Sequence, residues 1–350
     1  MPDATEEMRT LGTPMGRARM AEAFEAWIRR HEPVGGLISA GGSGGSSLVA
    51  PAMRALPIGV PKVLISSVAS GNVAPYVGPS DVMMLYSVAD VAGLNSVTRQ
   101  VLANGAAAIV GMVKARAESE ERHRSAAPRS ESKLAIGLTM FGVTTPCVNA
   151  VVDALEADFE CLVFHATGVG GQSMEKLVDS GGLTGVIDIT TTEVCDLLCG
   201  GVLPATEDRF GAIARTRVPY LGSCGALDMV NFGPKDSVPA RYAERKLYVH
   251  NPTVTLMRTT PQENDALGKE IAHKASAAKG PTAVLVPRRG VSAIDAEGKP
   301  FWWPEADAAL FQSLRLWMSP HVRLIELDLH VNDPEFARRA TSTLLEMINR

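Results

Sequence analysis

The chain has 350 residues, enough for about two domains that each have their own hydrophobic core. Its 46% hydrophobic and 21% charged residues are typical of a globular protein, and 34 basic against 38 acidic residues give a net charge of −4. This balance argues against nucleic acid as a partner. No apolar run approaches the roughly 20 residues that a bilayer crossing needs, so we expect no membrane span.

The cysteines indicate a reducing compartment. They are odd in number and lie mostly in apolar runs, at Cys147, Cys161, Cys195, Cys199 and Cys224. Cys195 and Cys199 are four residues apart on an expected helix, but no histidine follows nearby to complete a metal site, so we predict no bound metal there. The amino-terminal segment carries Asp3, Glu6 and Glu7 in place of the apolar stretch of a secretory signal. We therefore expect a cytoplasmic protein.

Short apolar runs alternate with longer helical patterns in the first third of the chain. Strands are predicted at 36–39, 63–67 and 82–85, and helices at 48–56 and 91–113. The stretch 114–133 then becomes highly charged and contains Pro128, which is typical of a linker or of an exposed helix end. We accordingly predict a first domain at 1–115, a charged linker at 116–133 and a second domain at 134–350.

A second alternating series occupies the rest of the chain. Strands are predicted at 134–139, 161–165, 185–189, 220–223, 283–287 and 322–327. Helices are predicted at 146–156, 173–180, 193–199, 262–278, 305–318 and 334–349. Several strands are almost continuously apolar, as in sheets covered on both faces. The predicted fold class is therefore α/β, with two Rossmann-like, doubly wound domains whose sheets are mostly parallel.

The most informative segment follows the first expected strand and reads Gly41-Gly42-Ser43-Gly44-Gly45-Ser46-Ser47. Glycines let the backbone approach a ligand closely, and the N–H groups at the start of the next helix point toward negative charge. The segment lacks the Lys-Ser/Thr pair of a Walker A motif and the spacing of a dinucleotide fingerprint. Phosphate binding and a tight turn without a ligand are equally compatible with it.

A second glycine-rich turn, with Gly168, Gly170 and Gly171, follows the strand expected at 161–165. A ligand phosphate or carboxylate and plain turn chemistry explain it equally well.

Asp81 precedes the third expected strand, and Asp90 follows it. Either carboxylate could orient a ribose or a metal ion, although helix capping is the simpler explanation of both.

Four side chains of the second domain are candidates for catalysis. Ser223 and Cys224 follow an expected strand, but a cysteine nucleophile needs a base, and only a distant histidine such as His250 could supply one. A buried, inert thiol is therefore the favoured reading of Cys224. Arg258 lies in an apolar and hydroxyl-rich run, where it would either clamp an anion or pair with a structural carboxylate.

A series of motifs resembles the Tm-one-like ATP-binding domain family over nearly the whole chain from about Ala21. The motifs are Gly41–Gly45, Pro51–Pro57, Ser70–Val73, Tyr76–Asp81, Asp90–Asn95, Phe164–Gly171, Val254–Thr260 and Arg289–Ser292. The resemblance implies two Rossmann-like subdomains, a homodimer and ATP bound near the first glycine-rich segment. It places Gly41, Gly42, Ser43, Gly44, Gly45 and Ser46 at the phosphates, with Asp81 near the sugar or a magnesium ion.

Family members usually begin with a further strand-loop-helix unit that carries a Gly-Thr-Asp-Thr-Lys-like turn. Here only the short segment 1–30 comes before the strand that leads into the glycine-rich segment, so we expect either that the sequence starts late or that the first domain is reduced, with a sheet edge that needs a partner. The leading hypothesis is a protein that binds ATP or a related phosphorylated ligand. The alternative is an enzyme that acts on a small anionic metabolite, an oxo acid or a sugar phosphate, by hydrolysis or carbon–carbon bond chemistry. Its interdomain cleft would bring together Thr145, Gly168, Gly170, Ser223, His250 and Arg258.

Overall fold

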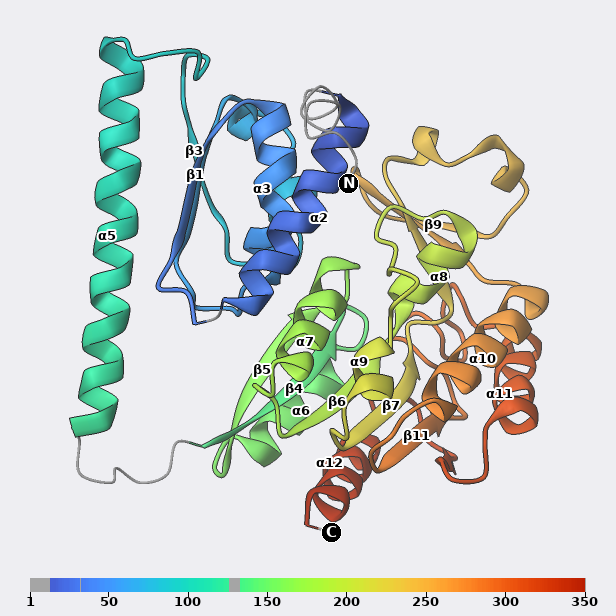
Figure 1. Ribbon diagram of the computed structural model, residues 1–350. Coiled ribbons are helices and arrows are strands. Elements are labelled where there is room, and N and C mark those ends of the chain that lie inside the picture. The colour runs from blue at the N-terminus through green and yellow to red at the C-terminus, as the bar shows by residue number, and fades with distance from the viewer. Residues whose placement is uncertain (1–12, 32, 126–132, 350) are drawn as a thin grey trace, which may run out of the picture. The chain divides into compact units, whose positions relative to one another are not determined.

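The computed structural model describes residues 13–31, 33–125 and 133–349 (Figure 1). The chain divides into two compact units, Met1–Glu131 and Ser132–Arg350. Each unit is built around its own parallel sheet. Among the described residues, no helix combines the length and the apolarity that a bilayer crossing demands.

The first unit contains a three-stranded parallel sheet in the order β1-β2-β3. Its elements are α2 (Pro14–Arg30), β1 (Leu37–Gly41), α3 (Ser43–Ala55), β2 (Lys62–Ser66), η1 (Ser67–Ser70), α4 (Ala74–Val77), β3 (Met83–Tyr86) and α5 (Ser96–Ser125). The central strand β2 is buried along its whole length. Leu64 packs toward Val49 and Met53 of α3, whereas Val63 and Ile65 pack toward α5. The alternation of side chains along β2 thus places α3 and α5 on opposite faces of the sheet (Figure 1).

The second unit contains a six-stranded parallel sheet in the order β12-β11-β7-β6-β4-β5. Its strands are β4 (Leu134–Met140), β5 (Phe159–His165), β6 (Gly185–Thr190), β7 (Tyr220–Gly225), β11 (Thr282–Pro287) and β12 (Arg323–Leu327). Its helices are α6 (Thr145–Leu155), α7 (Val169–Asp179), α8 (Thr192–Cys199), α9 (Gly211–Arg215), α10 (Pro261–Ser276), α11 (Pro304–Trp317) and α12 (Pro334–Ile348), with short 3-10 turns η2 (Lys235–Ser237) and η3 (Ala240–Tyr242). A small antiparallel sheet, β8-β10-β9, comes from β8 (Met229–Phe232), β9 (Leu247–Asn251) and β10 (Val254–Arg258).

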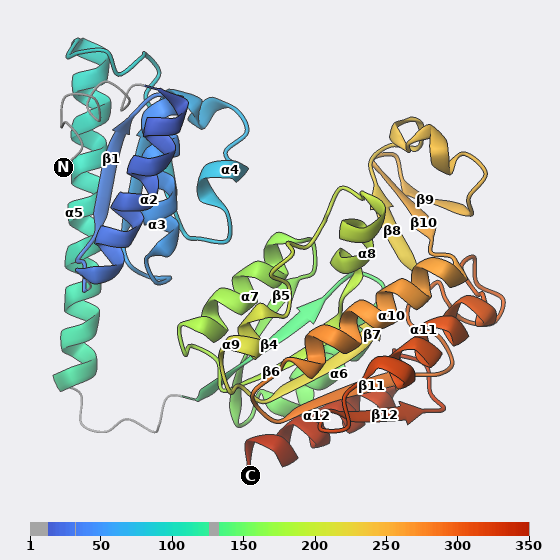
Figure 2. The ribbon, with the colours of Figure 1, turned by 45° about the vertical axis from the view of Figure 1, so that its right-hand side comes forward.

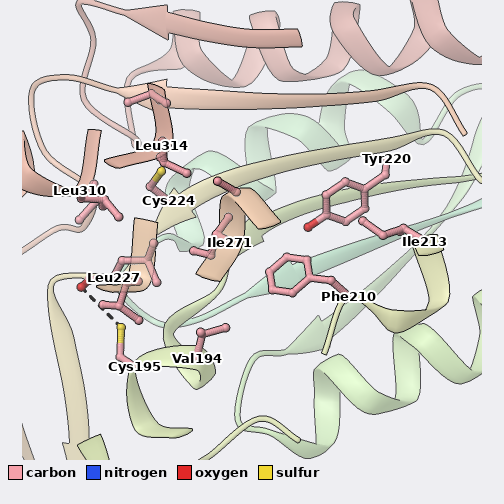
Figure 3. Close-up of a cluster of buried hydrophobic side chains, with 14 of the residues drawn as sticks. Val194, Cys195, Phe210, Ile213, Tyr220, Cys224, Leu227, Ile271, Leu310 and Leu314 are labelled. Atoms are coloured by element: carbon pink, nitrogen blue, oxygen red, sulfur yellow. Dashed lines mark hydrogen bonds between the residues drawn. The ribbon is translucent and has the colours of Figure 1, made fainter. Parts of the chain in front are cut away.

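Helices cover both faces of the large sheet (Figure 2). One core packs α6 and α12 against inward side chains such as Ile136 and Ile187. The other packs α7, α8, α9, α10 and α11 against the opposite face, and Figure 3 shows Phe210 beside Tyr220 within it. Cys195 and Cys224 are both buried there, and the Cys195 thiol donates to the carbonyl of Leu227 at 3.5 Å. The second unit is therefore doubly wound.

The predicted fold class, α/β with mostly parallel sheets, is confirmed. The antiparallel sheet was not predicted, because its strands are short and carry polar residues such as Asn231 and His250. Helix α2 was also missed, since its apolar stripe is diluted by charged residues. Residues 116–125 of the expected linker are helical, as the end of α5, and 126–132 lie outside the described residues.

Candidate functional site

The glycine-rich segment that follows β1 is a helix start and not an extended loop. Gly42 is the N-cap of α3, and the first backbone hydrogen bond of the helix runs from the Ser46 N–H to the Gly42 carbonyl at 2.9 Å. The N–H groups of Ser43, Gly44 and Gly45 therefore precede the helical ladder and point out of its end. The predicted helix at 48–56 began too late because glycine has a low helix propensity.

Side chains from neighbouring elements lie close to the glycines of this helix start, and the Cβ direction of Gly45 is unobstructed. A Cβ atom added at Gly45 would meet nothing within 4 Å. At Gly42 the Cβ position lies 3.5 Å from Ser67 Oγ and 3.8 Å from Asp90 Oδ1, and at Gly44 it lies 3.6 Å from Arg17 Cδ. Ser67 follows β2 and Asp90 follows β3, so all three carboxyl ends of the sheet contribute. We call Ser43–Gly45 with these three side chains the α3 site.

Ser46 fixes the first turn of α3 from the buried side of the helix, and its side chain is not available to a ligand. Its side chain is fully buried, where Oγ donates to the Gly42 carbonyl at 2.9 Å and lies 2.7 Å from Ser66 Oγ. This pair of hydroxyls ties the first turn of α3 to the end of β2. Gly41 is the last residue of β1 and pairs with Ser66 in the sheet.

Asp81 lies at the opposite ends of the strands of this sheet, where β2 and β3 begin. Its carboxylate accepts from Lys62 Nζ at 2.6 Å and from the Gly59 N–H at 2.8 Å, and Lys62 is the first residue of β2. The α3 site is at the other end of β2, beside Ser66, about 13 Å away at 3.3 Å per residue. The Lys62 side chain is fully buried and holds the pKa of Asp81 below its usual value by hydrogen bonding, against the opposing effect of burial. Asp81 is therefore a partner for a buried lysine and is separate from the α3 site.

The turn at Gly168, Gly170 and Gly171 is filled by the protein itself. Gly168 has φ +80° and donates its N–H to Glu193 Oε2 at 2.7 Å. A Cβ at Gly170 would lie 1.8 Å from the His165 carbonyl oxygen, and a Cβ at Gly171 would lie 1.9 Å from Glu193 Oε1. The turn-chemistry alternative accounts for these glycines, because an internal carboxylate occupies the amino terminus of α7.

Ser223 and Cys224 are buried at the end of β7. Burial raises the pKa of the Cys224 thiol to about 12, so the group stays protonated at neutral pH. Ser223 Oγ has no hydrogen-bond partner among the described residues. Neither side chain lines a described pocket.

Arg258 forms the centre of a buried ion cluster. Its Nη2 donates to Asp307 Oδ1 at 2.6 Å and lies 3.5 Å from Asp295 Oδ1, and its Nε donates to the Phe301 carbonyl at 2.7 Å. The guanidinium is fully buried. Of the two alternatives for Arg258, an anion clamp or a partner for structural carboxylates, its surroundings therefore fit the second.

His250 does line a pocket, but the other members of the postulated catalytic group do not accompany it. The pocket is about 530 Å³ and lies between the loops after β4 and β5 and the antiparallel sheet. The lining of this pocket includes none of the other five residues, which are Thr145, Gly168, Gly170, Ser223 and Arg258. Since this convergence was the premise of the enzymatic alternative, no observation favours that alternative.

Within residues 13–31, 33–125 and 133–349, no group of three or more His, Cys, Asp or Glu side chains is arranged to hold a metal ion. Burial raises the pKa of both Cys195 and Cys199, the latter to about 12, as expected for thiols packed in a core.

Sequence reasoning missed two features. Arg17 reaches the α3 site because α2 packs against α3, and no local motif signals that contact. Arg209 is a buried cation that meets Asp188 at 2.7 Å, Glu193 at 2.5 Å and Glu175 at 3.1 Å. Only the acidic residues in apolar runs could have signalled this cluster, because a buried carboxylate requires a partner.

The two parallel sheets, with glycine-rich turns leading from strands into helices, define an α/β protein of the doubly wound class. Residues 5–118 match the N-terminal domain and residues 133–348 the C-terminal domain of the Uncharacterised protein family (UPF0261). The chain belongs to this UPF0261 family, which confirms the Tm-one-like resemblance.

Curated relatives extend over nearly the whole chain. It is 55% identical to a UPF0261 protein of Rhizobium meliloti over 95% of this chain and 81% of the relative. A UPF0261 protein of Clostridium tetani is 47% identical over 92% of this chain and 78% of its own length. The ToMV resistance protein Tm-1 of Solanum lycopersicum is 46% identical over 94% of this chain, which corresponds to 44% of that longer protein.

Proposed function

We propose that the protein binds ATP or a related phosphorylated ligand at the α3 site. The observation that carries this proposal is the group of three successive N–H groups, from Ser43, Gly44 and Gly45, that lie outside the helical ladder where the strands of a parallel sheet end. Such amides satisfy phosphate oxygens, and the dipole of the 13-residue helix adds partial positive charge. The implied ATP-binding role of Tm-one-like proteins supports the same assignment.

Each side chain around the site has a distinct role in this proposal. Arg17 lies beside Gly44, where a guanidinium pairs with a phosphate oxygen. Ser67 offers a hydroxyl donor from the end of β2. Asp90 is exposed and supplies a carboxylate for the magnesium ion that accompanies ATP. Asp81 takes no part in ligand binding in this proposal, because it lies with Lys62 at the amino-terminal end of β2.

The test is calorimetric titration of ATP with magnesium into the wild type, Gly44→Asp and Gly44→Asn. A Cβ atom at Gly44 would lie 3.6 Å from Arg17 Cδ, an ordinary contact distance, so the backbone position accepts a side chain in both variants. The aspartate places a negative charge on the helix terminus, whereas the asparagine has the same shape and no charge. We expect Gly44→Asp to weaken binding at least about tenfold relative to Gly44→Asn, equivalent to 1.4 kcal/mol.

Two further ligands separate phosphate recognition from nucleotide recognition. Tripolyphosphate should compete with ATP for the α3 site, and adenosine should not compete at the same concentration. Equal ATP affinity in Gly44→Asp and Gly44→Asn would remove the phosphate role of the helix start. Competition by adenosine alone would instead move ATP recognition to a base-binding site.

A further inference from the structure

The second unit contains a pocket that the α3 site does not use. It is about 530 Å³, within the usual range for small-molecule sites. Its walls come from the loop after β4 with Phe141 and Val143, from His165 at the end of β5, and from Asn231 and Leu256 of the antiparallel sheet. We call this cavity the β4–β10 pocket.

The pocket occupies a favoured position in the doubly wound sheet. In the strand order, β5 lies on one side of β4 and β6 on the other, so the chain reverses direction across the sheet at β4. Ligands of open α/β sheets bind outside the carboxyl ends of the strands at such a reversal. Figure 2 shows the antiparallel strands standing beyond the end toward which β4 points. Residues of these strands line the pocket.

Asn231, one of the residues that line the pocket, carries a buried acceptor that has no hydrogen-bond partner among the described residues. Asn231 is fully buried, and its Nδ2 donates to Asp196 Oδ1 at 3.1 Å and to Thr192 Oγ1 at 3.4 Å. Because a flipped amide would turn its oxygen toward the Asp196 carboxylate, this orientation is fixed. Asn231 Oδ1 then has no hydrogen-bond partner among the described residues. An unsatisfied buried acceptor costs about 1–3 kcal/mol, which a ligand donor would recover.

The rest of the lining is apolar and aromatic. Val143 and Leu256 are buried core residues, and Tyr248 packs against the same cluster. The Phe141 ring stacks on His165 with centroids 5.2 Å apart and planes at 19°. Among the described residues that line the pocket, none is Arg, Lys, Asp or Glu. A phosphate or carboxylate would therefore meet no permanently charged side chain, only the imidazoles of His165 and His250, whereas a flat neutral ring would contact aromatic and aliphatic carbon.

We propose that the β4–β10 pocket binds a neutral aromatic ring that carries an N–H or O–H group, of the indole or phenol type. The ring packs among Phe141, Val143 and Leu256, and its donor hydrogen bonds to Asn231 Oδ1. This site is separate from the α3 site and takes a ligand of different chemistry, so its occupancy does not depend on nucleotide binding.

The experiment compares two probes that differ in whether the ring nitrogen carries a hydrogen or a methyl group. Indole and 1-methylindole are titrated into the full chain, and binding is followed by saturation-transfer NMR and equilibrium dialysis. We expect indole to bind at least about tenfold more tightly, because methylation removes the hydrogen that Asn231 Oδ1 accepts. Equal affinity of the two probes, or no binding of either at millimolar concentration, would overturn the proposal.

A pair of matched variants locates the bound probe. Ala293 lies on the exposed rim of the pocket, so Ala293→Trp fills the cavity from the solvent side. Ala243 is equally exposed but does not line the pocket, and Ala243→Trp is the control. Indole binding should be lost in the first variant and kept in the second, with both melting as the wild type does. Retained binding in a folded Ala293→Trp protein would place the probe elsewhere and refute the assignment.

Discussion

Arg209 Nη2 lies 2.7 Å from Asp188 Oδ2 and 2.9 Å from Asp188 Oδ1, and both side chains are buried beneath the carboxyl edge of the large sheet. The same aspartate accepts from the Tyr220 hydroxyl at 2.7 Å and from Thr139 Oγ1 at 2.6 Å. The interaction thus joins β4, β6 and β7 through one carboxylate. It also positions Arg209 to meet the Glu193 carboxylate that caps the Gly168 turn.

Removal of the Arg209 cation is expected to destabilise the second unit strongly. Arg209→Met leaves the carboxylates of Asp188, Glu193 and Glu175 buried without their partner, and such changes typically cost about 3–5 kcal/mol. The control is Arg338→Met, which removes an exposed pair with Glu335 and should change stability by less than about 0.5 kcal/mol. Urea unfolding measures both, and similar midpoints for the two variants would contradict the prediction.

Glu175 should make stability fall as the pH rises. Burial raises its pKa to about 7, above the ordinary value of 4.5 for a glutamate, so between these values the folded protein holds a proton that the unfolded chain has released. Its stabilising contribution is complete below about pH 4.5 and is lost as the pH rises through 7. One retained proton corresponds to a slope of about 1.4 kcal/mol per pH unit.

Glu175→Gln provides the matched measurement for this dependence. We expect the free energy of unfolding to fall less between pH 5 and pH 7.5 in this variant than in the wild type. An unchanged slope would show that Glu175 does not retain the proton.

The glycines of the second turn should be intolerant of a methyl group. A Cβ at Gly170 would lie 1.8 Å from the His165 carbonyl, so Gly170→Ala forces the backbone apart and should cost about 1–3 kcal/mol. Gly45→Ala places the same methyl group in open space within α3 and should be neutral or stabilising by up to about 1 kcal/mol. Thermal melting distinguishes them, and equal melting temperatures would argue against the close approach.

Asp81→Asn tests the separation of Asp81 from the α3 site. Buried Lys62 would lose its carboxylate and keep only the carbonyls of Pro57 and Val60, so stability should fall by about 1–3 kcal/mol. Because Asp81 lies at the opposite sheet edge, the affinity for ATP should stay within about twofold of the wild type. A large loss of ATP affinity in the folded variant would place Asp81 in the binding site after all.

The sequence allows the parallel layers to be predicted because their strands are almost continuously apolar. Strand β11, for example, was predicted within one residue of its bounds, Thr282–Pro287. The antiparallel sheet was not predicted, because the polar residues His250, Asn251 and Arg258 interrupt the apolar pattern of β9 and β10. Those strands nevertheless form one wall of the β4–β10 pocket.

Site residues were harder to predict than strands, because a chain position does not state which sheet edge a side chain reaches. The resemblance led us to expect Asp81 near a ligand bound at Gly44. The two residues lie instead at opposite ends of the parallel strands, separated by the length of β2. Ser67 could have been expected at the correct edge, since it directly follows β2. Arg17 depends on the packing of α2 against α3, which no local pattern encodes.

The early start of α3 bears on how a ligand would be received. Ordering one flexible residue costs about 1–2 kcal/mol in backbone entropy, and a mobile glycine loop would meet that cost during binding. Here Ser43, Gly44 and Gly45 are already helical, and Ser46 fixes the turn through Ser66. Association at the α3 site should therefore behave as docking onto fixed donors, with a small entropy penalty and no slow loop-closing phase.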